Sequence, residues 1–94
     1  MHDRESQRVG IRFPCAAQLP GSTLDVVVLD ITPSGCRLAT ASGLAKIGAT
    51  IVLLFSDRLD AAGQIVWRDE WECGVMFHEH ISENTIDWLA AQSE

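Results

Sequence analysis

The chain has few basic residues, few cysteines and no long apolar run. Its 94 residues include 7 Lys and Arg against 13 Asp and Glu, which gives a net charge of −6. Binding of a nucleic acid polymer depends on many cationic contacts to phosphates, so this charge balance excludes such a polymer as the partner. A membrane span needs about 18 consecutive apolar residues, and none occur, so we expect no membrane insertion.

The scarce cysteines exclude further classes of protein. Cys15, Cys36 and Cys73 are odd in number, lack C-x-x-C spacing and lie in apolar stretches, which indicates reduced core thiols. No apolar segment follows the charged N-terminus, so we expect no secretory signal and a cytoplasmic location. The chain also lacks metal-ligand spacing and any cysteine paired with a histidine, which predicts no metal site, no cofactor and no enzyme.

Short apolar segments separated by turn residues make up most of the chain. Alternation with a period of two, and runs rich in valine and leucine, predict six strands at residues 11–19, 23–31, 36–40, 49–55, 58–68 and 71–78. The second segment is apolar on both faces, which predicts a strand covered on both sides. This pattern is typical of a small all-β barrel or sandwich.

The two ends of the chain differ from this pattern. Residues 1–10 are polar and unpatterned and are interpreted as a flexible arm ahead of one domain at residues 11–94. Near the C-terminus the period becomes helical, which predicts a helix over residues 81–92 with Ser82 as its N-cap, covering an open end of the strands. The apolar stripe of this helix consists of Ile81, Thr85, Trp88 and Leu89.

Two motifs carry candidate binding residues. Arg4 and Arg8 form R-x-x-x-R in the arm, and two like charges at this spacing converge when an anion bridges them. The segment 30–35 reads D-x-T-x-x-G, and its Asp30 carboxylate matches the two adjacent N–H donors on guanine. Thr32 would add a hydroxyl contact, and Gly35 would let the backbone approach a ligand closely. A solvated terminus and a structural turn account for the same residues without a ligand.

The tryptophans form the third feature. Trp67 ends the apolar segment 64–67 beside polar residues, where an indole either packs in the core or stacks on a purine. Trp71 and Trp88 are assigned to packing. The acidic residues of the turn that follows Trp67 are interpreted as a solvated tip: Asp69, Glu70 and Glu72.

The two motifs, in this order and ahead of further strands, resemble the PilZ family of bacterial cyclic-di-GMP receptors. Segment 4–8 is similar to the family's arginine motif, segment 30–35 to its D/N-x-S-x-x-G motif, and segments 63–67 and 74–77 to its late strand pair. The resemblance implies a six-stranded antiparallel β-barrel with a short C-terminal α-helix. It also implies a second-messenger receptor that binds cyclic-di-GMP under its N-terminal arm and signals to a downstream protein.

The resemblance also implies roles for individual residues. Arg4 and Arg8 would clamp phosphates and stack on guanine, and Asp30 would bind a guanine edge. The other expected contacts come from Thr32, Gly35 and Trp67. The chain departs from the family pattern where Thr32 replaces the usual serine and where Asp3 stands in place of a further arginine. A degenerate PilZ-like domain, which acts through protein contacts without nucleotide binding, is the alternative.

Overall fold

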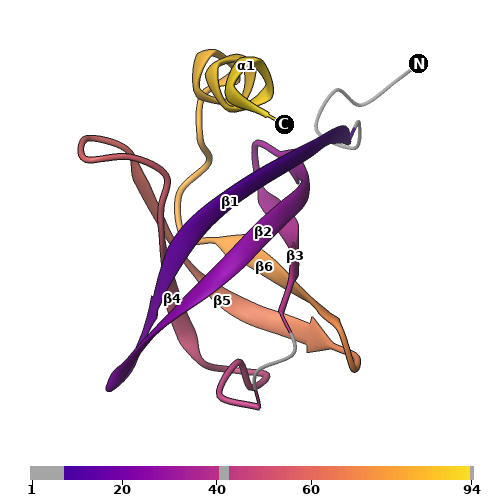
Figure 1. The fold of residues 1–94 in the computed structure, drawn as a ribbon, viewed down its shortest axis with the longest axis vertical. Coiled ribbons are helices and arrows are strands. Elements are labelled where there is room, and N and C mark those ends of the chain that lie inside the picture. Colours follow the sequence, from indigo (N-terminus) through magenta and orange to yellow (C-terminus); the bar gives the residue numbers. More distant parts are fainter. Residues whose placement is uncertain (1–7, 41–42, 94) are drawn as a thin grey trace.

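Six antiparallel strands close into a barrel in the part of the chain that the structure, a computed structural model, describes: residues 8–40 and 43–93 (Figure 1). The strands and the single helix of this part are β1 (Val9–Leu19), β2 (Ser22–Thr32), β3 (Gly35–Ala39), β4 (Thr50–Leu54), β5 (Asp60–Arg68), β6 (Glu72–Phe77) and α1 (Glu83–Gln92). Around the barrel the order is β1-β2-β3-β6-β5-β4. The expected six-stranded antiparallel barrel with a short C-terminal helix is confirmed.

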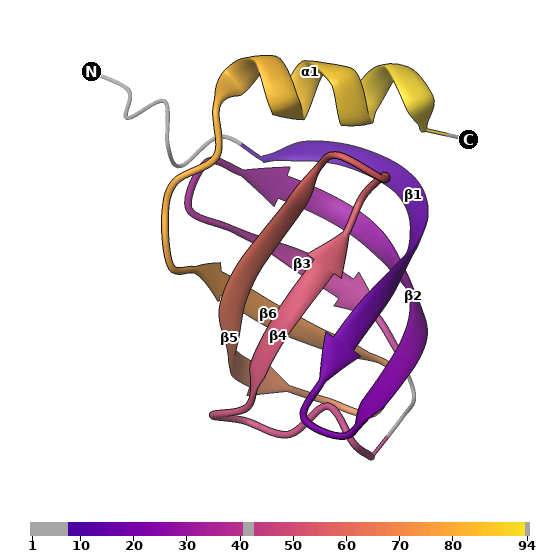
Figure 2. The same cartoon turned by 90° about the vertical axis from the view of Figure 1, so that its left-hand side faces the viewer.

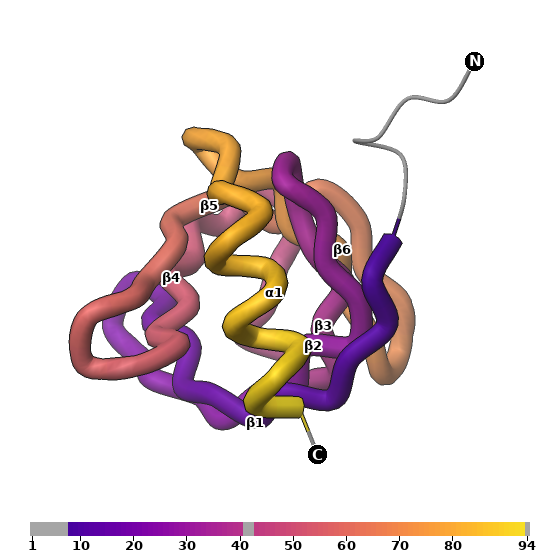
Figure 3. The backbone as a smooth tube through the Cα atoms, turned by 90° about the horizontal axis from the view of Figure 1, so that it is seen from above, coloured from indigo at the N-terminus to yellow at the C-terminus, as the bar shows by residue number. Residues whose placement is uncertain are grey.

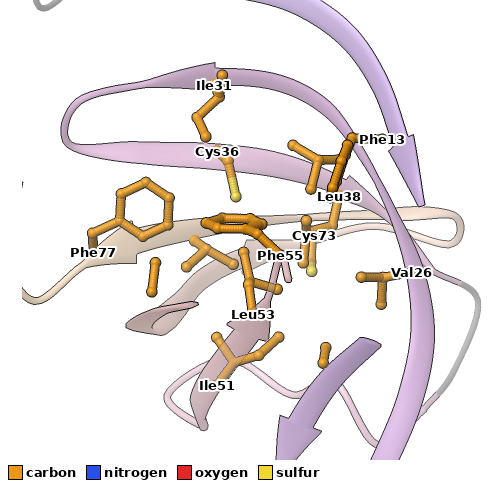
Figure 4. Packing of buried hydrophobic residues seen from close by; sticks show 14 of the residues in the cluster. Phe13, Val26, Ile31, Cys36, Leu38, Ile51, Leu53, Phe55, Cys73 and Phe77 are labelled. Atoms are coloured by element: carbon orange, nitrogen blue, oxygen red, sulfur yellow. The ribbon is translucent and has the colours of Figure 1, made fainter. Parts of the chain in front are cut away.

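The barrel interior is filled by apolar side chains from every strand (Figure 4). Ile31, Leu38 and Leu53 are completely buried, and the ring of Phe13 meets that of Phe55 edge-on at a centroid distance of 6.1 Å. The alternating sequence pattern therefore marks the inward face correctly for most strands. The prediction that β2 is covered on both sides is wrong, because Val27 and Leu29 on its other face are half-exposed.

The helix α1 lies across one end of the barrel (Figures 2 and 3). The Ser82 hydroxyl accepts a hydrogen bond from the Thr85 N–H at 3.1 Å, so the predicted N-cap is confirmed. Ile86 and Leu89 are the helix residues buried in the core. Trp88 is 37% exposed and packs the edge of its ring against Phe13. No helix of the described residues is long and apolar enough to cross a membrane.

The three thiols are free, and two of them belong to the core. Cys36 and Cys73 are buried, while Cys15 is half-buried on β1. Loss of hydration on burial raises the pKa of Cys15 to about 11 and raises those of Cys36 and Cys73 above their ordinary value. Burial therefore favours the protonated form of each thiol, which is the less nucleophilic form.

Candidate functional site

Two bulges determine which side chains reach the outer face of the barrel. In β2, Val28 pairs with Leu38 and Asp30 with Arg37, so Leu29 is an extra residue on its strand. In β5, Ile65 pairs with Val75 and Trp67 with Gly74, so Val66 is the extra residue there. An extra residue shifts the in-and-out alternation by one position. Asp30 and Trp67 therefore point outward, although Val28 and Ile65, two positions before them, point into the core.

The two outward residues belong to one row that crosses five strands. Along this outer row the registers pair Gly10 on β1, Asp30 on β2, Arg37 on β3, Gly74 on β6 and Trp67 on β5. Paired residues of neighbouring strands point to the same side of the sheet. The row therefore brings an acid, a guanidinium and an indole to one face, from segments far apart in the sequence.

The Asp30 carboxylate lies between two arginines. Its Oδ1 accepts a hydrogen bond from Arg8 Nη1 at 2.9 Å, and its Oδ2 accepts one from Arg37 Nε at 2.8 Å. Arg37 Nη1 also donates to Glu72 Oε1 at 3.0 Å. The bonds to Asp30 and then Glu72 raise the pKa of the Arg37 guanidinium above its ordinary value. Four charges of alternating sign thus connect the residue just before β1 with β2, β3 and β6 on the outer face.

Trp67 lies directly over Gly74. A Cβ atom built on Gly74 would be 2.0 Å from Trp67 Nε1, so no larger residue fits while the indole keeps this position. Trp67 is 40% exposed, so part of its side chain is accessible to solvent. Of the two interpretations that the sequence leaves open for Trp67, the structure therefore excludes a position in the core, and stacking on a purine stays a prediction.

An open hollow of about 190 Å³, called the outer hollow below, lies between these charges and the indole. The side chains and backbone that line it belong to Arg8, Thr32, Ser34, Gly35, Cys36, Arg37, Val66, Trp67, Gly74, Val75 and Met76. Asp30 is not among these residues, since its side chain is only 9% exposed and lies beside the two arginines. One wall of the hollow is cationic, and the other is apolar, with Trp67 and the 52%-exposed Met76.

The turn between β2 and β3 uses the predicted motif residues for its own structure. Thr32 Oγ1 accepts hydrogen bonds from the N–H groups of Ser34 and Gly35, both at 3.2 Å. A Cβ on Gly35 would lie 2.3 Å from the Val75 carbonyl oxygen, so this glycine lets β3 approach β6. Thr32 and Gly35 thus have structural roles at the rim of the outer hollow, whatever else they bind.

Most of the candidate binding residues therefore meet at one place. The outer hollow gathers Arg8, Thr32, Gly35 and Trp67, with Asp30 bonded to Arg8. Arg4 lies outside the described residues. Charged groups at one wall and an exposed ring at the other can hold a ligand that carries both phosphate and a flat base.

Several residues that line the outer hollow are absent from the sequence-based prediction, among them Arg37, Met76 and Gly74. A usable signal existed for Arg37, because a two-residue turn at 33–34 pairs position 30 with position 37. Nothing local indicated Gly74 or Met76, because β6 reaches β3 through long-range pairing. Two interpretations of exposed residues are wrong. Trp71 is 65% exposed and does not pack, and Glu72 is bonded to Arg37 and is not a solvated tip residue.

The fold is a small six-stranded antiparallel barrel with a hollow on its outer face, and the comparisons with known proteins identify its family. The PilZ domain family matches residues 2–93, so the chain belongs to the PilZ family. PilZ domains are generally receptors for cyclic-di-GMP and are non-catalytic, which confirms the expectation that the chain is not an enzyme.

A solved structure shares the fold. The Bacillus subtilis inhibitor of motility MotI/DgrA matches with a TM-score of 0.64 and 13% sequence identity, over 98% of this chain and 50% of that protein. The chain thus spans half the length of that protein, and at this identity the match shows a common fold. The comparison with curated proteins gives no significant match.

Trp67 and Gly74 provide a direct test of the outer face. We expect Gly74→Ala to displace the indole and to lower the free energy of unfolding by about 1–3 kcal/mol, as overpacking does. Gly10→Ala is the matched control, because it lies on the same outer row with nothing within 4 Å of its Cβ. Urea unfolding and the indole N–H signal of Trp67 in NMR spectra measure the effect. Equal, small changes in both variants would contradict the close packing of Trp67 on Gly74.

Proposed function

We propose that the chain is a cyclic-di-GMP receptor that binds its ligand at the outer hollow. The observation that carries the proposal is that a member of the PilZ family gathers Arg8, Thr32, Gly35 and Trp67 around one hollow on its surface. In this arrangement Arg8 binds a phosphate, and a guanine stacks on the exposed side of Trp67. The backbone at Gly35 and the Thr32 hydroxyl complete the rim.

The size of the outer hollow fits part of the ligand. At about 190 Å³ it is smaller than the roughly 300–1,000 Å³ of pockets that enclose a drug-sized molecule. One base and an adjacent phosphate would occupy it, while the rest of the dinucleotide extends over the surface. Arg4, five residues before Val9 at the start of β1, would contribute a second guanidinium to the part of the ligand outside the hollow.

Asp30 is proposed to bind the guanine edge. A carboxylate has about four lone-pair positions, and two of those on Asp30 are used by the arginines. Guanine offers two adjacent donors to such a group, N1–H and the N2 amino group, whereas the same edge of adenine offers one. The acid therefore gives the hollow a preference for guanine.

A degenerate domain without nucleotide binding is the second candidate. It is favoured by the fact that the polar groups of the site already bond to one another: Asp30 to two arginines, and Thr32 to the turn. In such a module the exposed Trp67 and Met76 would contact a partner protein. Direct measurement of nucleotide binding separates the two candidates.

Calorimetry with cyclic-di-GMP and cyclic-di-AMP tests the proposed ligand. We expect cyclic-di-GMP to bind more tightly by about 1–3 kcal/mol for each guanine read by a bidentate contact, because adenine leaves one carboxylate acceptor unpaired. Equal affinity for the two dinucleotides would remove Asp30 from base recognition. Failure of both to bind would favour the degenerate domain.

Arg8→Ala separates binding from folding. The Arg8 side chain is 64% exposed, so its ion pair with Asp30 should contribute at most about 1 kcal/mol to the free energy of unfolding. Loss of a charge-assisted bond to phosphate should weaken cyclic-di-GMP binding by about 1.5–3 kcal/mol. Arg58→Ala, which removes the same charge in the turn between β4 and β5, is the matched control. Unchanged affinity in Arg8→Ala would show that Arg8 does not bind the ligand.

We further propose that ligand binding orders the part of the arm ahead of β1, residues 2–8, over the barrel and that a downstream protein recognises the resulting surface. Two arginines four residues apart must converge on one ligand, which fixes the backbone between them at a cost of roughly 1–2 kcal/mol per residue. We expect amide hydrogen exchange in residues 2–8 to slow when cyclic-di-GMP is added, since Val9 and Gly10 already belong to β1. Exchange that is equally slow without ligand, or equally fast at saturation, would contradict this switch while leaving binding intact.

A further inference from the structure

The buried carboxylate of Asp30 is held by two arginines of different character. Arg37 lies in the middle of β3, between β2 and β6, and its guanidinium is bonded on both sides, to Asp30 and to Glu72. Arg8 lies just before β1, and its side chain is 64% exposed against 39% for Arg37. A side chain that is more exposed and held at a strand end exchanges partners more easily than one held on both sides within a sheet.

The bond to Oδ2 fixes the orientation of the carboxylate. The χ2 torsion of an aspartate is broad, so a carboxylate without partners samples many orientations. Arg37 Nε holds Oδ2 at 2.8 Å, and the rotation of its own guanidinium is limited by the second bond, from Nη1 to Glu72 Oε1. A planar guanidinium with two fixed partners is a rigid support for the acid. Oδ1 is then the oxygen whose partner, Arg8, can change.

We propose that Arg37, supported by Glu72, is a positioning residue that determines the base specificity of the outer hollow, and that Arg8 is the exchangeable partner of Asp30. This inference rests on the proposed function. In the free protein Arg8 occupies Oδ1. When ligand binds, Arg8 moves from the carboxylate to a phosphate, and the guanine N1–H and N2–H donors take its place on an acid that Arg37 keeps in orientation. The network thus exchanges one charge-assisted bond for others without leaving the buried acid unpaired.

The discriminating probe is cyclic-di-IMP, which lacks the N2 amino group and keeps the N1–H, the ribose and both phosphates. The ratio of its dissociation constant to that of cyclic-di-GMP reports the second contact to the carboxylate. For the unmodified chain we expect a ratio of about ten or more, because a hydrogen bond to a charged group is lost.

Arg37→Met removes both bonds of the guanidinium while retaining the length of the side chain. If Arg37 positions the acid, the ratio in this variant falls toward one, mainly because cyclic-di-GMP loses affinity. Arg37→Lys, which can still donate to Oδ2, should give an intermediate ratio. If Arg37→Met weakens the binding of cyclic-di-GMP and cyclic-di-IMP equally, the ratio is unchanged and Arg37 binds phosphate itself. If neither affinity changes, Arg37 has only a structural role. Either result overturns the proposal.

Glu72→Gln gives a second measurement in case Arg37→Met fails to fold. It leaves Arg37 bonded to Asp30 and weakens the support on the other side, so we expect the ratio to fall by about two- to fivefold, as for a partly exposed ion pair. A Glu72→Gln ratio equal to that of the unmodified chain would then overturn the proposal.

The NMR signal of the Arg37 Nε–H follows the exchange directly, since this hydrogen is the one donated to Oδ2. Its exchange with water should stay slow when cyclic-di-GMP is added, and fast exchange in the complex would show that Arg37 is the arginine released. If the unmodified chain binds cyclic-di-GMP and cyclic-di-IMP with equal affinity, the role assigned to Arg37 is overturned while nucleotide binding stays intact. Absence of any binding would overturn the proposed function together with this inference.

Discussion

The in-and-out alternation of a closed barrel is the constraint on which the site depends. Every strand must keep its apolar residues inside, so a residue two positions from a core residue also points inside unless the strand contains an extra residue. Leu29 and Val66 are such residues, and they let Asp30 and Trp67 point outward while Val28 and Ile65 stay in the core. Without the bulges, an acid would enter an apolar interior that offers it no partner.

The charge network explains how the fold tolerates the buried carboxylate of Asp30 and how one of its oxygen atoms can still change partner. Each oxygen of Asp30 has a guanidinium partner, so the carboxylate does not lie unpaired. The Arg8 side chain of this pair is 64% exposed, so water screens the ion pair and the pair contributes little stability. A phosphate can therefore compete for Arg8 at low cost. Under the proposed function, Arg8 takes the place of the ligand on Asp30 in the free protein, and binding is an exchange of partners.

Fold and site differ in how far local patterns predict them. The strands, the terminal helix and its Ser82 cap follow from periodicity and capping residues, since these depend on neighbours a few positions away. Trp71, which the sequence assigns to packing, is exposed at a hairpin tip. Residue type alone does not distinguish such a position from one in the core. The half-exposed outer face of β2 shows the same limit, since an apolar run has the same composition whether one or both faces are buried.

The sequence by itself determined the hairpin that carries Asp30. A two-residue turn at 33–34 pairs 32 with 35 and 30 with 37, so the contact between Asp30 and Arg37 is contained in local spacing. Only the tertiary structure decided that β6 lies beside β3 and that β5 follows it, which places Gly74 and then Trp67 next to Arg37. The physical reason is that a tight turn fixes register within a few residues, whereas pairing of distant strands is set by closing the barrel around one apolar core.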